Sequence, residues 1–284
     1  MLNIAGNIFF ILIVISMSVK AQTEFKGTSF YGTETDPFAY EKSLGAVIVL
    51  DAAYPKILNG TNIVAFPSAI NGICTPQYQT TNQPPFLPIA TTNNFPAIHF
   101  TGVTNPSSNT RHLRYDEFAS MISGNKPFTI VCLLNAHTNF NNLTAWSLGY
   151  SDAANAAGSR VAIRPGSNTY GTSAMEFGSD TNLAVSAVNR SGMDTNKYFY
   201  STVFYNGSTT TLAVNRTVSA TTLANAGTLT LNQFTIGMGR RINGSYATPW
   251  DGYITYLAAF TNDLRGTSFT NLVNYLNTKK YPVF

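Results

Sequence analysis

The amino-acid sequence predicts an all-β protein, an antiparallel β-sandwich with one helix near the C-terminal end. Many short apolar segments of strand length are separated by turn residues, which is typical of sandwiches. Charged residues make up 11% of the 284 residues, against about 25% in an average soluble protein, and Asn, Thr and Ser replace them. Helical spacing of apolar residues occurs only towards the C-terminus. With 44% hydrophobic and 13% aromatic residues, the chain has the composition of a folded protein rather than a disordered one.

The expected strands share an apolar or alternating pattern bounded by turn residues. In chain order they are Gly45–Asp51, Ala97–Thr101, Pro127–Leu134, Ala145–Gly149, Arg160–Arg164, Leu183–Val188, Tyr198–Tyr205, Thr210–Asn215, Phe234–Met238 and Gly252–Phe260. The pair Asn206-Gly207 between two of these strands predicts a hairpin. The stretch Asn71–Pro96 is crowded with Pro, Asn and Gln and predicts a long loop, whereas Tyr115–Ile122 predicts a helical turn.

A helix is expected from Thr267 onward, because apolar residues recur at i, i+3, i+4 and i+7. These residues are Phe269, Leu272, Val273 and Leu276. The two basic doublets of the chain, Arg240-Arg241 and Lys279-Lys280, are expected to be solvated surface charges. The formal net charge is only +4 and no basic stripe is visible, so nucleic acid is not an expected partner.

The N-terminal residues have the pattern of a secretory signal peptide. An apolar run, Ile8–Val19, is followed by Lys20-Ala21-Gln22, and Val19 and Ala21 suit the two specificity positions of a cleavage site. The run is shorter than the about 20 apolar residues that a membrane-spanning helix needs. We therefore expect a signal peptide over residues 1–21, an extended lead-in or edge strand over 22–44, and a single sandwich domain over 45–284. The signal ends in Val-Lys-Ala-Gln and resembles those of secreted Bacteroidetes-type proteins, which predicts a secreted bacterial protein, extracellular or at the cell surface.

Several segments resemble, in order, the motifs of the concanavalin A-like lectin/glucanase superfamily. The likeness is to laminin-G-like (LamG-type) jelly-roll domains of secreted bacterial proteins. The matching segments are Leu50–Ala52, Pro96–Gly102, Phe128–Leu133, Phe204–Gly207, Leu212–Asn215, Phe234–Gly237, Trp250–Ile254 and Leu264–Tyr281. The chain departs from the family pattern at Arg216, at Cys132, and at Tyr256, where the family has an acidic residue. The resemblance implies a concanavalin A-like jelly roll, a fold that hosts glycosidases, lectins, adhesive modules and structural proteins.

The sequence lacks the motifs of four common enzyme classes, so we expect a protein that is not an enzyme. Glycoside hydrolysis needs two carboxyl groups flanking the bond, and sandwich glucanases place them in a Glu-x-Asp-x-(x)-Glu pattern. None of the five glutamates begins that pattern; they are Glu24, Glu34, Glu41, Glu117 and Glu176. The Gly-x-Ser-x-Gly, His-Glu-x-x-His and P-loop motifs are also absent from the sequence. A glycoside hydrolase with atypical catalytic residues is kept as a second alternative.

The leading hypothesis is a non-catalytic protein that binds a glycan or a surface protein, in adhesion or carbohydrate recognition. The expected contact surface is the loop before the last strand, because an exposed aromatic ring beside polar side chains suits sugar binding. Its residues are Arg240, Arg241, Asn243, Tyr246 and Trp250. Trp250 is expected to expose its ring at a loop-to-strand boundary, while Trp146 lies on an expected strand and is assigned to the core.

No cofactor or metal site is expected. The histidines His99, His112 and His137 are scattered and do not have zinc-site spacing. Side-chain oxygen atoms of the kind that bind Ca²⁺ occur in two pairs of turn residues, but without a clear calcium-binding motif. The pairs are Asp180 with Asn182 and Asp194 with Asn196. Cys74 and Cys132 form a disulfide, or Cys132 is a buried free thiol; the sequence leaves both open.

The other alternative is a structural or assembly subunit of an extracellular appendage, a surface complex or a virion. The low charge and abundant Thr, Asn and Tyr suit a protein that packs against its own copies. The 22–44 lead-in could add a strand to a neighbour's sheet. This alternative predicts self-association or a membrane-complex partner.

Overall fold

The structure is a computed structural model in which residues 1–35, the predicted signal peptide and most of the predicted lead-in, lie outside the described part. The described residues are 36–54, 57–59, 62–65, 68, 70, 86–87, 94–101, 112–137, 143–149, 160–165, 173–178, 196–220, 222–224, 227–240 and 246–284.

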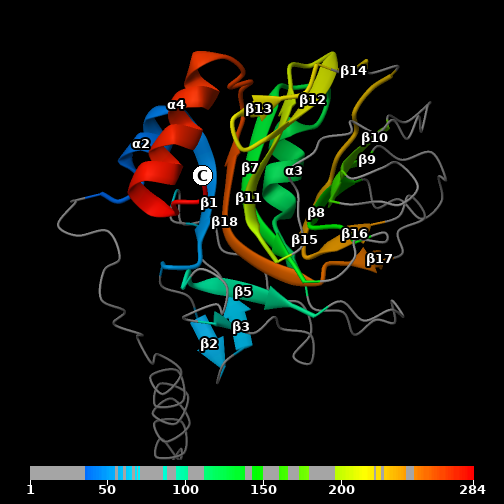
Figure 1. The fold of residues 1–284 in the computed structure, drawn as a ribbon. Coiled ribbons are helices and arrows are strands. Elements are labelled where there is room, and N and C mark those ends of the chain that lie inside the picture. The colour runs from blue at the N-terminus through cyan, green and yellow to red at the C-terminus, as the bar shows by residue number, and fades with distance from the viewer. Residues whose placement is uncertain are drawn as a thin grey trace, which may run out of the picture.

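The strands form two larger antiparallel sheets and two small hairpins, as expected for a β-sandwich (Figure 1). One sheet has nine strands, in the order β13 (Thr217–Val218), β12 (Thr209–Val214), β11 (Tyr198–Tyr205), β7 (Phe128–Ala136), β18 (Gly252–Phe260), β5 (Ala97–Phe100) and β4 (Phe86–Leu87), with β1 (Ala46–Asp51) beside β18 and β14 (Leu223–Ala224) beside β12. The other has five, in the order β10 (Ser173–Gly178), β9 (Arg160–Pro165), β8 (Trp146–Gly149), β15 (Gln233–Ile236) and β6 (Leu113–Arg114). The small hairpins pair β2 (Ile57–Asn59) with β3 (Asn62–Ala65), and β16 (Met238–Arg240) with β17 (Tyr246–Pro249).

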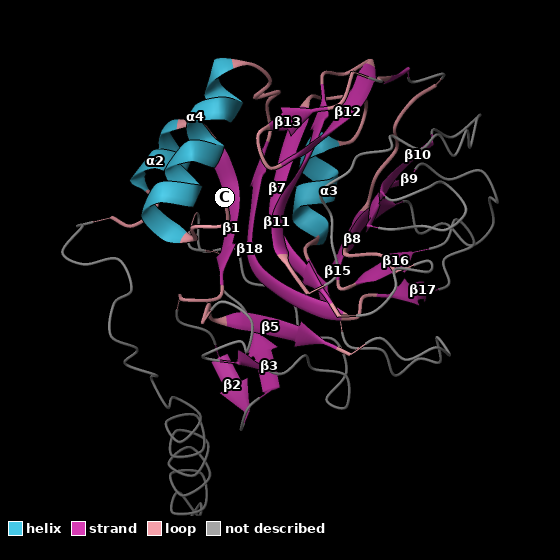
Figure 2. Ribbon diagram, in the orientation of Figure 1, coloured by secondary structure: helices cyan, strands magenta, loops and turns pink. Residues whose placement is uncertain are grey.

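The nine-stranded sheet is covered on both faces (Figure 2). Every residue of its central strands β7 and β18 is buried. Along β7, Ile130, Cys132 and Leu134 contact the core between the two sheets, whereas Val131 and Leu133 belong to a second core under the helices. A strand buried on both faces needs apolar residues at successive positions, which explains the continuous apolar run of β7.

Among the described residues, two helices lie on the outer face of the nine-stranded sheet and one lies on the inner side. The helix α4 (Thr267–Tyr275) buries Phe269, Leu272 and Val273, which confirms the predicted C-terminal helix. It continues into a π-helical turn, η1 (Leu276–Lys280). The short helix α2 (Ala39–Ser43) packs nearby. The helix α3 (Asp116–Ile122) confirms the helical turn expected at Tyr115–Ile122 and contributes to the core between the sheets. Within the described residues, no helix is long and apolar enough to cross a membrane.

Two expectations from the sequence are wrong: that residues 39–43 are extended, and that Lys280 lies in solvent. Residues 39–43 were expected to be extended but form α2, because the Asp36 carboxylate accepts the Phe38 N–H at 3.1 Å and the Phe38 ring is buried, starting a turn. Lys280 was expected in solvent but is only 2% exposed, because two buried carboxylates lie beside it.

The strand pattern differs from the expected one in a few places. The expected strand Phe234–Met238 is divided at Gly237, whose φ of +86° turns the chain out of the five-stranded sheet into β16. The expected loop Asn71–Pro96 contains the short strand β4, and the strand expected at Leu183–Val188 lies outside the described residues. The hairpin β2–β3 and strand β10 were not predicted.

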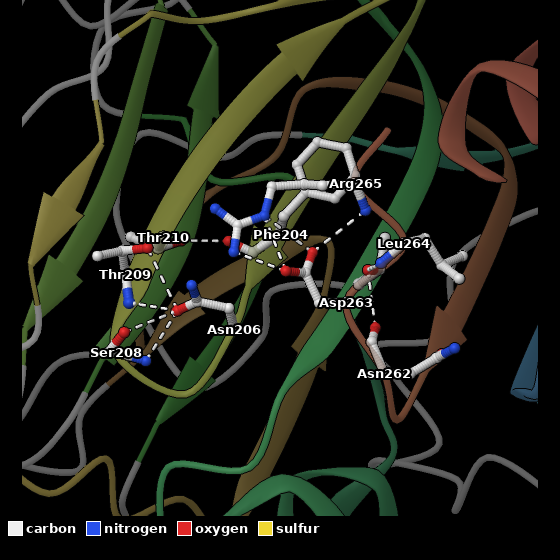
Figure 3. A network of polar contacts seen from close by, with 10 residues as sticks. Phe204, Asn206, Ser208, Thr209, Thr210, Asn262, Asp263, Leu264 and Arg265 are labelled. Atoms are coloured by element: carbon white, nitrogen blue, oxygen red, sulfur yellow. Dashed lines mark hydrogen bonds and ion pairs between the residues drawn. The ribbon is translucent and has the colours of Figure 1, made fainter. Parts of the chain in front are cut away.

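Polar residues close the connections at one end of the nine-stranded sheet (Figure 3). In the predicted β11–β12 hairpin, the Asn206 side-chain oxygen accepts the backbone N–H groups of Ser208 and Thr209 at 2.9 and 2.7 Å. In the connection from β18 to α4, the Asp263 carboxylate pairs with the Arg265 guanidinium at 2.6 Å. These contacts satisfy polar groups within each turn, so residues close together in the sequence stabilise this end of the sandwich.

Candidate functional site

Of the five predicted contact residues, the structure describes Arg240, Tyr246 and Trp250. Arg240 ends β16 and Tyr246 begins β17, and the two residues are paired across this small hairpin. Arg241 and Asn243 lie outside the described residues. The hairpin therefore brings Arg240 and Tyr246 together, while the proposed contact surface as a whole stays a prediction.

The expected exposure of Trp250 is wrong, whereas the core assignment of Trp146 is confirmed. Both indole rings are 0% exposed and belong to the core between the two sheets. The backbone N–H of Trp250 donates to the Gly237 carbonyl at 2.9 Å, which fixes the main chain between β17 and β18. A ring held in this way contributes packing energy and cannot serve as a stacking platform on the surface.

The residues that follow Trp250 lead to a different polar cluster, which we call the histidine–tyrosine cluster: His99, His137, Asp251 and Tyr253. Tyr253 on β18 is paired with His99 on β5, and its ring centroid lies 5.0 Å from that of His99 and 4.2 Å from that of His137. The two imidazole centroids are 5.2 Å apart. Both histidines are half-buried, and the side chains of His137 and Asp251 are 25% and 21% exposed, so solvent reaches both.

Sheet topology explains why these residues meet. Strand β18 lies between β5 and β7, so its first residues face the end of β7, which His137 follows, and also face His99. The His137 N–H donates to the Asp251 carbonyl at 3.1 Å and extends this pairing by one residue. Gly252 permits the close approach, because a Cβ atom there would lie 2.1 Å from the Asn135 carbonyl oxygen.

The electrostatics of the cluster keep His137 uncharged at neutral pH. Burial lowers the pKa of His137 below its ordinary value of 6.5, and the nearby Asp251 carboxylate opposes this effect only in part. The His137 Nδ1 and an Asp251 carboxylate oxygen are 4.0 Å apart, longer than a hydrogen bond. A neutral imidazole has one donor and one acceptor nitrogen, so the cluster offers both kinds of group to a ligand.

The candidate metal ligands and the two cysteines lie only partly within the described residues. Within the described residues, no three His, Cys, Asp or Glu side chains are placed to hold a metal ion. Asp180, Asn182, Asp194 and Cys74 lie outside that part of the chain. Of the two alternatives for Cys132, the structure shows the buried free thiol, and burial raises its pKa well above the ordinary value.

Sequence reasoning missed the histidine–tyrosine cluster because its members are far apart in the chain. His99, His137 and Tyr253 become neighbours only through the order of β5, β18 and β7 in the sheet. The available signal was their position at or beside strand ends: His99 lies within a short expected strand and His137 follows the strongest one. Strand order would have been needed to combine them.

Comparisons with known proteins identify the fold. No protein-family model matches the chain, and no curated protein matches it. Among solved structures, the chain is similar to domain 4 of AbnA, a GH43 extracellular arabinanase from Geobacillus stearothermophilus, in complex with arabinotriose. The match has 14% sequence identity and a TM-score of 0.50, and it covers 70% of this chain and 83% of that chain. It is also similar to Trypanosoma rangeli sialidase in complex with 2,3-difluorosialic acid, with 12% identity, 82% of this chain and a TM-score of 0.52. The chain spans only 33% of the sialidase. At these identities the likeness establishes the fold, and the chain is a jelly-roll β-sandwich.

Proposed function

We propose that the protein is a secreted, non-catalytic, laminin-G-type domain that recognises carbohydrate, in adhesion at a bacterial cell surface. The histidine–tyrosine cluster is the proposed contact site. The observation that carries the proposal is the meeting of two imidazoles, a carboxylate and a tyrosine ring at the ends of three adjacent strands. The predicted signal peptide over residues 1–21 supports export.

The chemistry of the cluster suits sugar hydroxyl groups. The Asp251 carboxylate accepts hydrogen bonds from hydroxyl groups, while the neutral imidazole of His137 donates one and accepts one. The buried Tyr253 ring supports both imidazoles from within the sheet and holds their orientation. Binding groups on strand ends are held more precisely than groups on loops, which limits the entropy lost on binding.

Two further points support recognition rather than catalysis. Domain 4 of the arabinanase, which has a similar fold, was solved with arabinotriose bound. The carboxylates Glu41 and Asp51 are both 0% exposed, so a polysaccharide cannot reach them.

The test is binding of the secreted protein to a glycan array that includes arabinotriose, followed by calorimetry on the glycans retained. We expect the variants His137→Ala and Asp251→Asn each to weaken binding by about tenfold, because the loss of one hydrogen bond costs about 1.4 kcal/mol. Asp263→Asn is the matched control, because Asp263 follows β18 as Asp251 precedes it and its side chain has a similar exposure of 22%. This control should bind as the wild type does.

Three outcomes would overturn the proposal. If both cluster variants bind the retained glycans with wild-type affinity, the site is wrong. If the protein releases sugars from any polysaccharide over many turnovers, the non-catalytic assignment is wrong. Absence of any glycan binding on the array would reject carbohydrate recognition itself.

A further inference from the structure

Three ionisable side chains from distant parts of the chain meet beneath the helices on the outer face of the nine-stranded sheet. Lys280 comes from η1, Glu41 from α2 and Asp51 from the end of β1. The Lys280 Nζ lies 2.7 Å from Glu41 Oε1 and 3.8 Å from Asp51 Oδ2. All three side chains are at most 1% exposed, so the contact is sealed from solvent.

Aromatic residues enclose this site. The Lys280 Nζ is 4.2 Å from the centroid of the Phe38 ring and 5.4 Å from that of Tyr256. The Tyr256 hydroxyl donates to Glu41 Oε1 at 2.8 Å. Asp51 Oδ1 accepts the Ala53 N–H at 2.9 Å and also the Tyr281 hydroxyl. The two carboxyl groups are therefore held in fixed orientations around the amine.

The charges of the three groups do not balance. Fully ionised, two carboxylates and one ammonium carry one net negative charge, and an uncompensated buried charge is costly. Glu41 Oε2 is buried and has no hydrogen-bond partner among the described residues, which makes full ionisation costlier still. The site is neutral when one carboxyl group keeps its proton, and a carboxylic acid beside an amine is the pair from which an amide is made.

We propose that Lys280 and Asp51 form an intramolecular amide bond, and that Glu41 transfers the proton. The Lys280 ammonium first gives a proton to the Glu41 carboxylate, and the resulting free amine attacks the side-chain carbonyl carbon of protonated Asp51 and forms the N–C bond. Glu41 then passes its proton to Asp51 Oδ2 and takes up a proton from the nitrogen. The C–Oδ2 bond breaks and the oxygen leaves as water, so one amine and one acid give one amide and one water. Glu41 ends protonated, the site keeps zero net charge throughout, and no oxidant or other reactant is required.

The contacts of Asp51 identify it, rather than Glu41, as the acid that reacts. Its Oδ1 has two donors, the Ala53 N–H and the Tyr281 hydroxyl, which stabilise negative charge on that oxygen when the carbon is attacked. Its Oδ2 faces the amine and is the oxygen that leaves. Glu41 Oε1 lies at hydrogen-bond distance from the nitrogen, the position required for a proton carrier.

The test is the intact mass of the secreted, denatured protein, measured after its first residue has been identified. We expect the wild-type chain to be lighter than its sequence mass by one water, and a protease digest to contain a branched peptide that joins Asp51 to Lys280. Lys280→Arg and Glu41→Gln should each restore the full mass. Asp51→Asn should lose ammonia instead of water, because the amide nitrogen then leaves. Lys279→Arg is the control: Lys279 is exposed, and this variant should keep the loss of water.

The wild-type measurement decides the matter even if a variant fails to fold. A wild-type chain of full sequence mass, with Asp51 and Lys280 recovered in separate linear peptides, would overturn the proposal. Loss of water located elsewhere in the chain would overturn it equally.

Discussion

The substitution Gly237→Ala tests how tightly the strand end beside Trp250 is packed. Gly237 has a φ of +86°, and a Cβ atom on it would lie 2.2 Å from two atoms of the Phe100 ring. The ring is fully buried in the core between the sheets and cannot turn away into solvent. The variant therefore combines an unfavourable backbone conformation with a steric overlap.

The two costs can be separated with a matched control. A non-glycine residue in the left-handed region costs about 1–2 kcal/mol. Overpacking a core by a methyl group costs about 1–3 kcal/mol more. Gly124 has a φ of +81° but no atom within 4 Å of its Cβ position, so Gly124→Ala carries only the backbone cost. We expect Gly237→Ala to lower the free energy of unfolding by roughly 2–5 kcal/mol and Gly124→Ala by roughly 1–2 kcal/mol.

The assay is equilibrium unfolding in urea, followed by the fluorescence of Trp146 and Trp250. Both rings are fully buried, so their emission reports loss of the core between the sheets. Equal destabilisation by the two alanine variants, within about 0.5 kcal/mol, would show that the Phe100 contact is not tight and would refute the packing argument.

Three further predictions concern residues near the same core. Trp250→Ala should lower the free energy of unfolding by about 3–5 kcal/mol in urea, because a fully buried ring is lost; unchanged stability would contradict the burial. The folded state lowers the pKa of His137 below 6.5, so the unfolded state binds the proton of this histidine more readily. The free energy of unfolding should therefore keep its full value above pH 6.5 and fall as the pH drops from 6.5 through the lowered pKa. His137→Phe should reduce this slope in unfolding curves taken between pH 7.5 and 5, and an unchanged slope would count against it. Cys132, whose pKa is raised by complete burial, should react with a thiol reagent only after unfolding, and rapid native labelling would disprove this.

The fold could be predicted because local patterns decide most of it. The apolar run of β7, the Asn206-Gly207 turn and the stripe Phe269–Leu276 each depend on neighbouring residues, and the structure contains all three. The short helix α2 was missed because a helix of five residues has almost no periodic signal and depends on tertiary contacts.

The candidate sites could be predicted only in small part. Trp250 was placed on the surface because it stands at a strand boundary, yet the turn at Gly237 and the pairing of β18 direct its ring inward. Lys280 was assigned to solvent because lysine is almost never buried without a partner. Its partners, Glu41 and Asp51, come from the opposite end of the chain, and only strand order brings them together.

The pairing of β1 with β18 also constrains how the chain reaches its native state. Ala46 lies opposite Phe260, so β1, which is synthesised early, finds its neighbour β18 only when almost the whole polypeptide has been made. Such non-local pairing slows folding and leaves apolar segments exposed in the meantime. The nascent chain should therefore depend on chaperones that hold β1 and β7 apart from other proteins until synthesis is complete.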